Sequence, residues 1–359
     1  MGRHVMRPST LPVLFVLLAG LPTRGGEAPR EEKSVPDNLI LLRNEHLEVG
    51  VFPQLGGRVV SLKRTGGQNV LLDRHADLLD APEERLPKPS PNGTWAGEGH
   101  IVWIGPQKDW WRHQDLNASR KKQGAGWPPD PWIECGRFEV TERDERRVKM
   151  VGPASPITGL QLAKEIVLEE KLVRFVVTAR NRRDRDVAWD LWTNTRLPAQ
   201  ARGFVPALRG EALRLEFISG QLATERPLEL RYVDGFAYFE CPAALPDGVN
   251  ALRAKLFLKS RAAFAAGFLR DTVFVKRAVV TPPEAQVHPD QASLEVYQAL
   301  TRDGKFSLLE LEFHGACVEL APDAEMSFAE TWELLPYAGD DTPEAQAAFL
   351  RAVLDRERR

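Results

Sequence analysis

Short runs of branched and apolar residues, separated by turn residues, recur along most of the chain. In residues 160–168 and 172–180, apolar and polar side chains alternate with the two-residue period of a strand that has one buried face. Charged pairs such as Glu169-Glu170 mark hairpin turns between such runs. The same pattern predicts strands over residues 39–42, 47–52, 58–63, 132–141, 147–151, 187–193, 213–218, 228–233, 236–240, 253–259, 263–269, 272–277, 294–300, 308–313 and 326–335.

About fifteen hairpin-linked strands, with almost no helical pattern between them, predict an all-β fold: a large antiparallel β-sandwich. One helix is expected, at the C-terminus. Thr342 is a good N-cap, Pro343 suits the first helical position, and the apolar residues that follow recur on one face. No shift in composition divides the chain, so we expect one β-sandwich domain over residues 38–338, followed by a helical segment over 339–359.

The N-terminus has the pattern of a cleaved signal peptide over residues 1–28. Basic residues precede an apolar run at 11–21 that is too short to span a bilayer, and Gly26-Glu27-Ala28 offers a cleavage site. A flexible lead-in over residues 29–37 is expected to follow. The sequence therefore predicts a secreted or periplasmic protein with no membrane segment after cleavage.

Composition is that of a globular protein, with 43% hydrophobic and 27% charged residues and a net charge of −2. No basic block is long enough to suggest nucleic acid as a partner. Cys135, Cys241 and Cys317 each lie among apolar residues, which favours buried free thiols. Because no spacing of Cys, His or carboxylates matches a metal-ligand motif, we expect no metal and no other cofactor.

A tryptophan-rich stretch over residues 95–132 carries the candidate chemistry. It holds six of the nine tryptophans, interleaved with glycines, prolines, amides, carboxylates and imidazoles, and only residues 100–104 fit a strand. Flat aromatic faces beside such groups suit a sugar, whose C–H faces stack on rings and whose hydroxyls form hydrogen bonds. The alternative is a packed loop that uses tryptophan as an anchor. The candidate sugar-binding residues of the stretch are Glu98, Trp103, Gln107, Trp111 and Trp127.

Both ends of the mature chain resemble one known family. NEHLEVGVFPQLGGRVVSLKRTGGQNVLL is similar to the start of galactose-mutarotase-like (aldose 1-epimerase superfamily) domains, and ELAPDAEMSFAETWELLP is similar to their last strands. Between them, GEGHIVWIGPQKDW and GWPPDP resemble an uncharacterised branch of that superfamily. The resemblance implies a β-supersandwich with a carbohydrate site on a concave sheet face.

The resemblance also implies catalytic roles. Mutarotases of this superfamily open and close a hexose ring with a histidine acid and a glutamate base, and His100 lies where a first histidine is expected. The second histidine usually follows a Thr-Asn pair, but Thr195 stands at that position, after Asn194, which could still bond a sugar hydroxyl. Arg58, after a Gly-Gly pair, could neutralise an acidic substituent or be a solvated strand residue.

Carboxylates are available on one face of the predicted strand at 308–313. Alternation places Glu310 and Glu312 on the same side, where they could serve as a catalytic base or simply face water. Glu295 is a further candidate. As a lone histidine in an apolar run, His100 is more often a satisfied core or rim residue. Glu98 should share a strand face with it and could raise the pKa of that histidine. His314, in polar surroundings, is expected at the surface.

Two functions are consistent with these patterns. The first is an exported carbohydrate-binding protein that acts on a sugar by His/Glu acid–base chemistry, as an aldose 1-epimerase-like isomerase. The second is a non-catalytic β-sandwich module that docks on a glycan or a protein.

Overall fold

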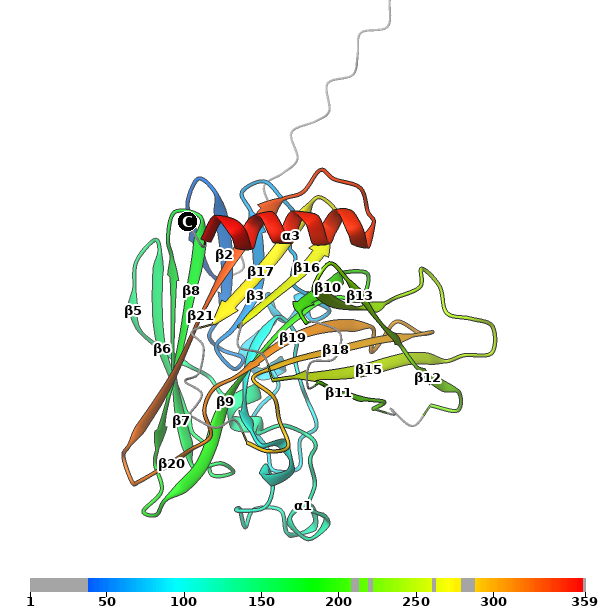
Figure 1. Ribbon diagram of the computed structural model, residues 1–359. Helices are drawn as coiled ribbons and strands as arrows, with labels where there is room; N and C mark the ends of the chain where they lie inside the picture. Colours follow the sequence, from blue (N-terminus) through cyan, green and yellow to red (C-terminus); the bar gives the residue numbers. More distant parts are fainter. Residues whose placement is uncertain (1–37, 208–212, 219–221, 260–262, 279–287, 358–359) are drawn as a thin grey trace, which may run out of the picture. The chain divides into compact units, whose positions relative to one another are not determined.

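Alternating apolar residues build two large sheets that pack face to face (Figure 1). The computed structural model describes residues 38–207, 213–218, 222–259, 263–278 and 288–357, all within one compact unit, Val35–Arg359. The predicted signal peptide and lead-in lie outside the described residues. In the described part of the chain, no helix is long and apolar enough to cross a membrane.

The first sheet has 11 strands among the described residues and is antiparallel except where β12 joins β15. Its main path runs, in spatial order, through β1 (Ile40–Arg43), β2 (Leu47–Phe52), β3 (Arg58–Arg64), β4 (His100–Gly105), β9 (Val187–Pro198), β19 (Leu308–His314), β18 (Leu294–Thr301), β15 (Ala251–Leu258) and β11 (Leu213–Glu216). Two short strands complete it: β12 (Glu225–Pro227) pairs with β15, and β20 (Val318–Leu320) pairs with β9.

The second sheet has 10 antiparallel strands in the described residues. In spatial order they are β13 (Glu229–Val233), β14 (Phe236–Glu240), β10 (Arg202–Pro206), β16 (Phe264–Leu269), β17 (Thr272–Ala278), β21 (Glu325–Pro336), β8 (Leu172–Asn181), β7 (Leu160–Leu168), β6 (Arg147–Ala154) and β5 (Glu139–Arg143). The predicted all-β sandwich is therefore confirmed.

The main core lies between the sheets. Leu309 and Leu311 of β19 meet side chains such as Phe274 and Trp332 of the second sheet, and all four are buried. Burial of one such side chain stabilises the fold by about 1.5–3 kcal/mol. Because the leucines of β19 point into this core, strand alternation places its glutamates on the opposite face of the sheet.

The C-terminal helix α3 (Pro343–Glu357) covers the outer face of the second sheet near β16 and β17 (Figure 1). Ala347 and Leu350 pack on Phe268 of β16 in a second, smaller core. Thr342 caps the helix, since its hydroxyl accepts a hydrogen bond from the backbone N–H of Ala345 at 3.3 Å. The predicted helix start is confirmed.

Some predicted elements are wrong. Residues 132–141 are not one strand: α2 (Pro131–Glu134) precedes β5, because Asp130 caps a helical turn whose first residue is Pro131. A further helix, α1 (Ala118–Gln123), begins after Asn117, whose side chain accepts a hydrogen bond from the Arg120 N–H. The sequence pattern also missed β10, β12 and β20. Three 3₁₀ turns complete the elements: η1 (Ala76–Leu78), η2 (Glu83–Arg85) and η3 (Gln107–Asp109).

Candidate functional site

The central strands of the first sheet present three rows of polar and aromatic side chains on the face turned away from the second sheet. Register places a residue of each strand beside its partner on the next. The first row is Arg196, Glu310, Tyr297 and Lys255; the second is Asn194, Glu312, Glu295 and Phe257; the third is Trp103, Trp192 and His314. Such a density of charge on one sheet face is typical of a functional site.

A hollow of about 570 Å³ opens over the first and third rows. Trp103 is 5% exposed and forms part of its wall, with its ring centroid 4.9 Å from that of Trp192 and 6.1 Å from that of Trp127. Trp127, which is 50% exposed, stands at the edge. Glu310 and Tyr297 line the same hollow beneath these rings. Aromatic walls over a polar floor are suited to a polyol.

A second hollow of about 460 Å³ adjoins the first. Gln107, Trp192, Ile218 and Lys255 line both. Glu295 lines the second hollow only, whereas Glu312 is 0% exposed and lies beneath the floor. Of the three candidate bases Glu295, Glu310 and Glu312, Glu310 is thus the one that lines the larger hollow.

Lys255 pairs with two buried carboxylates of the site. Its Nζ lies 2.8 Å from Glu295 Oε2 and donates a hydrogen bond of 2.8 Å to Glu312 Oε2, which also accepts one of 2.8 Å from the indole N–H of Trp192. Arg196 Nε donates to Glu310 Oε1 at 2.7 Å. These buried pairs fix the carboxylates in place, since a long side chain cannot leave without stranding a buried charge.

The network separates the pKa values of the carboxyl groups. Burial raises the pKa of Glu312 to about 7, with added repulsion from Glu310 and Glu295 that Lys255 only partly offsets. Burial also opposes ionisation of Glu310, but Arg196 and Lys255 outweigh it and lower the pKa of Glu310. The adjacent pair Glu310 and Glu312 therefore shares one proton near neutral pH, with the charge on the residue that faces the hollow.

His314 lies at the end of this network and not at the surface, so the surface expectation is wrong. It is buried, its Nδ1 lies 3.1 Å from Asp190 Oδ1, and its Nε2 lies 3.4 Å from Glu295 Oε1. Burial disfavours the charged ring, but Glu295 and Asp190 outweigh it and raise the pKa of His314 to about 9. The imidazolium is stacked on Trp192 with the ring centroids 4.9 Å apart.

Asn194, a candidate sugar-binding residue, is 0% exposed and lines neither hollow in the described part of the chain, so it lies beneath the floor beside Glu312. Among the described residues, neither its amide nitrogen nor its amide oxygen has a hydrogen-bond partner, although the side chain is fully buried. The Oε1 atom of Glu312, its neighbour in the second row, is likewise unpartnered. An unpaired buried polar group costs about 1–3 kcal/mol, so such atoms usually bind a ligand or a water.

Glu295, Glu312 and His314 also bring one ligand atom each within 4.8 Å of one another, a spacing that could hold a metal ion. The ammonium of Lys255 already bridges the two carboxylates, and His314 lies between Asp190 and Glu295. A divalent ion would have to compete with these cations.

His100 does not face either hollow. It lies on the inner face of β4 and packs between Phe175 and Trp332 of the second sheet, with ring centroids 4.4 and 4.5 Å away. Its Nδ1 is 2.9 Å from the hydroxyl of Thr195, and its Nε2 is 3.5 Å from Glu330 Oε1. Burial, with the positive charges of Lys276 and Lys164, lowers the pKa of His100 well below its ordinary value. In the described structure, position 100 and its partner Thr195 belong to the core.

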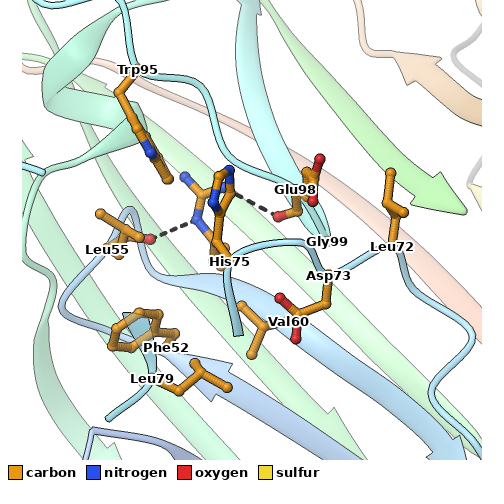
Figure 2. Close-up of a pocket in the computed structure, with 11 residues that line it drawn as sticks. Phe52, Leu55, Val60, Leu72, Asp73, His75, Leu79, Trp95, Glu98 and Gly99 are labelled. Carbon is orange, nitrogen blue, oxygen red and sulfur yellow. Dashed lines mark hydrogen bonds between the residues drawn. The ribbon is translucent and has the colours of Figure 1, made fainter. Parts of the chain in front are cut away.

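Arg58 is buried and joins several segments of the chain, so we interpret it as a structural brace. Its guanidinium lies 2.9 Å from Glu134 Oε2 with both side chains buried, and it also donates to the carbonyl oxygens of Leu55 and Glu98 at 2.8 and 3.2 Å. Figure 2 shows these two carbonyl groups beside Trp95, around a cavity of only about 10 Å³. Arg58 therefore contacts backbone and Glu134, and the cavity leaves no room for a sugar substituent.

Glu98 lines the larger hollow, as its candidate role requires, but it does not pair with His100. Its carboxylate accepts a hydrogen bond of 2.7 Å from the Arg74 backbone N–H and lies 3.1 Å from the Arg74 guanidinium. The expected increase in the pKa of His100 is therefore wrong, because the two side chains belong to different faces and different partners.

The tryptophans of residues 95–132 divide between the two predicted roles. Trp111 is a buried anchor: its indole N–H donates to Pro128 O at 2.7 Å and Arg120 lies 4.3 Å above its ring. In the described part of the chain, it lines neither hollow. Gln107, Trp103 and Trp127 all line the larger hollow. Gln107 donates a hydrogen bond of 2.7 Å to Gly126 O, which ties the loop to the edge of the site.

Comparison with solved structures identifies the fold. The chain is similar to a candidate aldose 1-epimerase from Klebsiella pneumoniae, with 12% identity, a TM-score of 0.52, and coverage of 87% of this chain and 81% of that chain. It is also similar to a galactose mutarotase-like protein from Lactobacillus casei, with 11% identity, a TM-score of 0.48, and coverage of 83% and 100%. A search of curated proteins found no match.

These findings define a galactose-mutarotase-like β-sandwich, and the predicted resemblance is confirmed at the level of fold. At such low identity the likeness concerns the fold and not the activity. The chain belongs to the family described as a domain of unknown function (DUF4380), whose model matches residues 38–335. This agrees with the predicted uncharacterised branch of the superfamily.

Proposed function

We propose that this protein binds a carbohydrate in the larger hollow and acts on its anomeric centre by acid–base chemistry. The observation that carries the proposal is the position of Glu310, at the floor of a hollow walled by Trp103, Trp127 and Trp192. A solved structure of similar fold is described as a candidate aldose 1-epimerase, which supports a sugar as the ligand class. The N-terminal pattern supports a secreted or periplasmic site of action.

Glu310 is the proposed base and Tyr297 the proposed acid. The hydroxyl of Tyr297 accepts a hydrogen bond of 3.1 Å from Arg253, which leaves its own proton free to be donated. The two residues are register partners on neighbouring strands. In ring opening, the base removes the proton of the anomeric hydroxyl and the acid protonates the ring oxygen. Both oxygens are bonded to the anomeric carbon, so groups on adjacent strands can reach them together.

The protonation state of Glu312 sets how strong a base Glu310 is. While Glu312 is protonated, it stabilises the charge on Glu310 and weakens it as a base. When Glu312 loses its proton, near pH 7, the added negative charge makes Glu310 a stronger base. The mutarotation rate should therefore increase as the pH rises through about 7. This pH dependence should disappear in the Glu312→Gln variant.

Polarimetric mutarotation with a panel of aldoses tests the proposal, together with isothermal titration of the same sugars. Glu310→Gln and Tyr297→Phe should each lower the rate by roughly 10²–10⁴, while affinity stays within a few-fold, because only proton transfer is lost. Trp103→Phe keeps an aromatic wall and serves as the matched control. It should change the affinity for sugar but not the rate of the catalytic step. A folded sample that binds no sugar at millimolar concentration would refute the proposal.

A non-catalytic docking module is the second candidate. Trp127 and Phe306, which are 50% and 60% exposed, form an aromatic edge that could contact a glycan without any chemistry. In that case the Glu310→Gln variant would match the wild type in every kinetic assay while Trp127→Ala lost affinity. This pair of variants separates the two functions.

A further inference from the structure

The two adjoining hollows together have a larger volume than one sugar ring would fill. Their volumes are about 570 and 460 Å³, and each lies within the range of about 300–1,000 Å³ that encloses a whole drug-sized ligand. Gln107, Trp192, Ile218 and Lys255 line both, so the two hollows meet at these side chains. A ligand that occupies the first hollow can continue across these side chains into the second.

The second hollow has the chemistry of a sugar subsite. Phe257 lies on its floor, and the guanidinium of Arg214 lies 3.9 Å from the centre of that ring. Glu216 and Asp290 add carboxylates at its margin. Gln291 also lines the hollow. Guanidinium, carboxylate and amide groups are the hydrogen-bond partners that sugar hydroxyls require.

From this arrangement we propose that the ligand is an oligosaccharide of at least two rings. This inference rests on the proposed function, which places the reducing ring over Glu310 and Tyr297 in the larger hollow. The next ring then crosses Trp192 and Lys255 and lies in the second hollow, where Arg214 contacts it. A free monosaccharide fills only the first subsite.

Isothermal titration with matched sugar pairs tests the inference. Each pair shares its reducing ring: glucose with cellobiose, maltose or lactose; mannose with mannobiose; xylose with xylobiose; and N-acetylglucosamine with chitobiose. At least one disaccharide should bind about tenfold or more tightly than its own monosaccharide, because the second ring adds several hydrogen bonds.

Arg214→Ala locates the second ring. Arg214 pairs with Glu216 two residues away at 3.0 Å, and both are half-exposed. Arg231 forms the same kind of pair with Glu229 at 2.8 Å on the second sheet, so Arg231→Ala is the matched control. Arg214→Ala should weaken the preferred disaccharide by about three- to tenfold and leave its monosaccharide unchanged, whereas the control should change neither.

The outcomes are distinct for the two proposals. If monosaccharides bind but no disaccharide binds more tightly than its partner, the oligosaccharide inference fails while the proposed function survives. Equal losses for monosaccharide and disaccharide in Arg214→Ala would also overturn it, because the arginine would then serve the first ring. Absence of binding by every sugar of the panel refutes both.

Discussion

Replacement of Arg58 is the sharpest test of how this fold holds its site. Arg58→Met removes a guanidinium that contacts Glu134 twice, through the carboxylate at 2.9 Å and the backbone oxygen at 2.6 Å. The bonds to Leu55 O and Glu98 O are lost at the same time. Methionine keeps much of the aliphatic length, so the change reports on charge and hydrogen bonding more than on volume.

The expected cost follows from what Arg58 leaves behind. The carboxylate of Glu134 would remain buried with only neutral donors, the backbone N–H of Gly97 and the indole N–H of Trp103. Removing one partner of a buried ion pair typically destabilises a protein by about 3–5 kcal/mol. We therefore expect the free energy of unfolding to fall by about 4 kcal/mol in Arg58→Met.

Urea unfolding monitored by tryptophan fluorescence measures this change. The double variant Arg58→Met with Glu134→Gln should be less destabilised than the sum of the single variants, because the stranded charge is gone. The matched control is Arg43→Met, whose ion pair with Glu48 is 3.0 Å long but whose side chain is 53% exposed, so it should cost less than about 1 kcal/mol. If Arg58→Met loses less than about 1 kcal/mol and instead abolishes sugar binding, the brace interpretation is refuted and a direct ligand role is restored.

Further predictions concern pH, the two kinds of tryptophan and export. The folded pKa values of Glu312 and His314, about 7 and about 9, lie above their ordinary values of 4.5 and 6.5, so both groups stabilise the fold at low pH and that stability is lost as the pH rises. Urea unfolding should show this loss between about pH 5 and 9, and a smaller one in Glu312→Gln. Trp127→Ala should weaken sugar binding about tenfold at unchanged stability, whereas Trp111→Ala should cost about 3–5 kcal/mol in unfolding experiments. N-terminal sequencing of exported protein should begin at Pro29, and an intact N-terminus would contradict signal cleavage.

Sequence periodicity predicted the strand faces of the site well. Alternation placed Glu310 and Glu312 together, and the structure confirms that both oppose the inward leucines of β19. Extension of the same rule by two residues would have added His314 to that face. The prediction for His314 was wrong because its partners in the buried network, Asp190 and Glu295, lie elsewhere in the sequence, so the residues next to it did not show that it is buried.

Other features required tertiary information. Alternation shows that two residues share a face, but it does not show which face meets the second sheet, so His100 could not be assigned to the core. The missed helix α2 had a local signal, since Asp130-Pro131 is the same cap and first-residue pattern that located α3 at Thr342-Pro343. No local signal distinguished the anchor Trp111 from the wall residue Trp103, because their difference depends on strands far along the chain.

The exchange of histidine for Thr195 carries less weight against activity than the sequence suggested. Positions 100 and 195 lie side by side in the structure, since they are register partners joined by a hydrogen bond. Both lie on the inner face of the first sheet, however, where Glu330 and Lys276 of the second sheet enclose them. A histidine at position 195 would face that core and could not reach a sugar in either hollow. Whether this protein is an enzyme therefore depends on the outer face, where Glu310 lines the larger hollow and the buried carboxyl group of Glu312 lies next to it along β19.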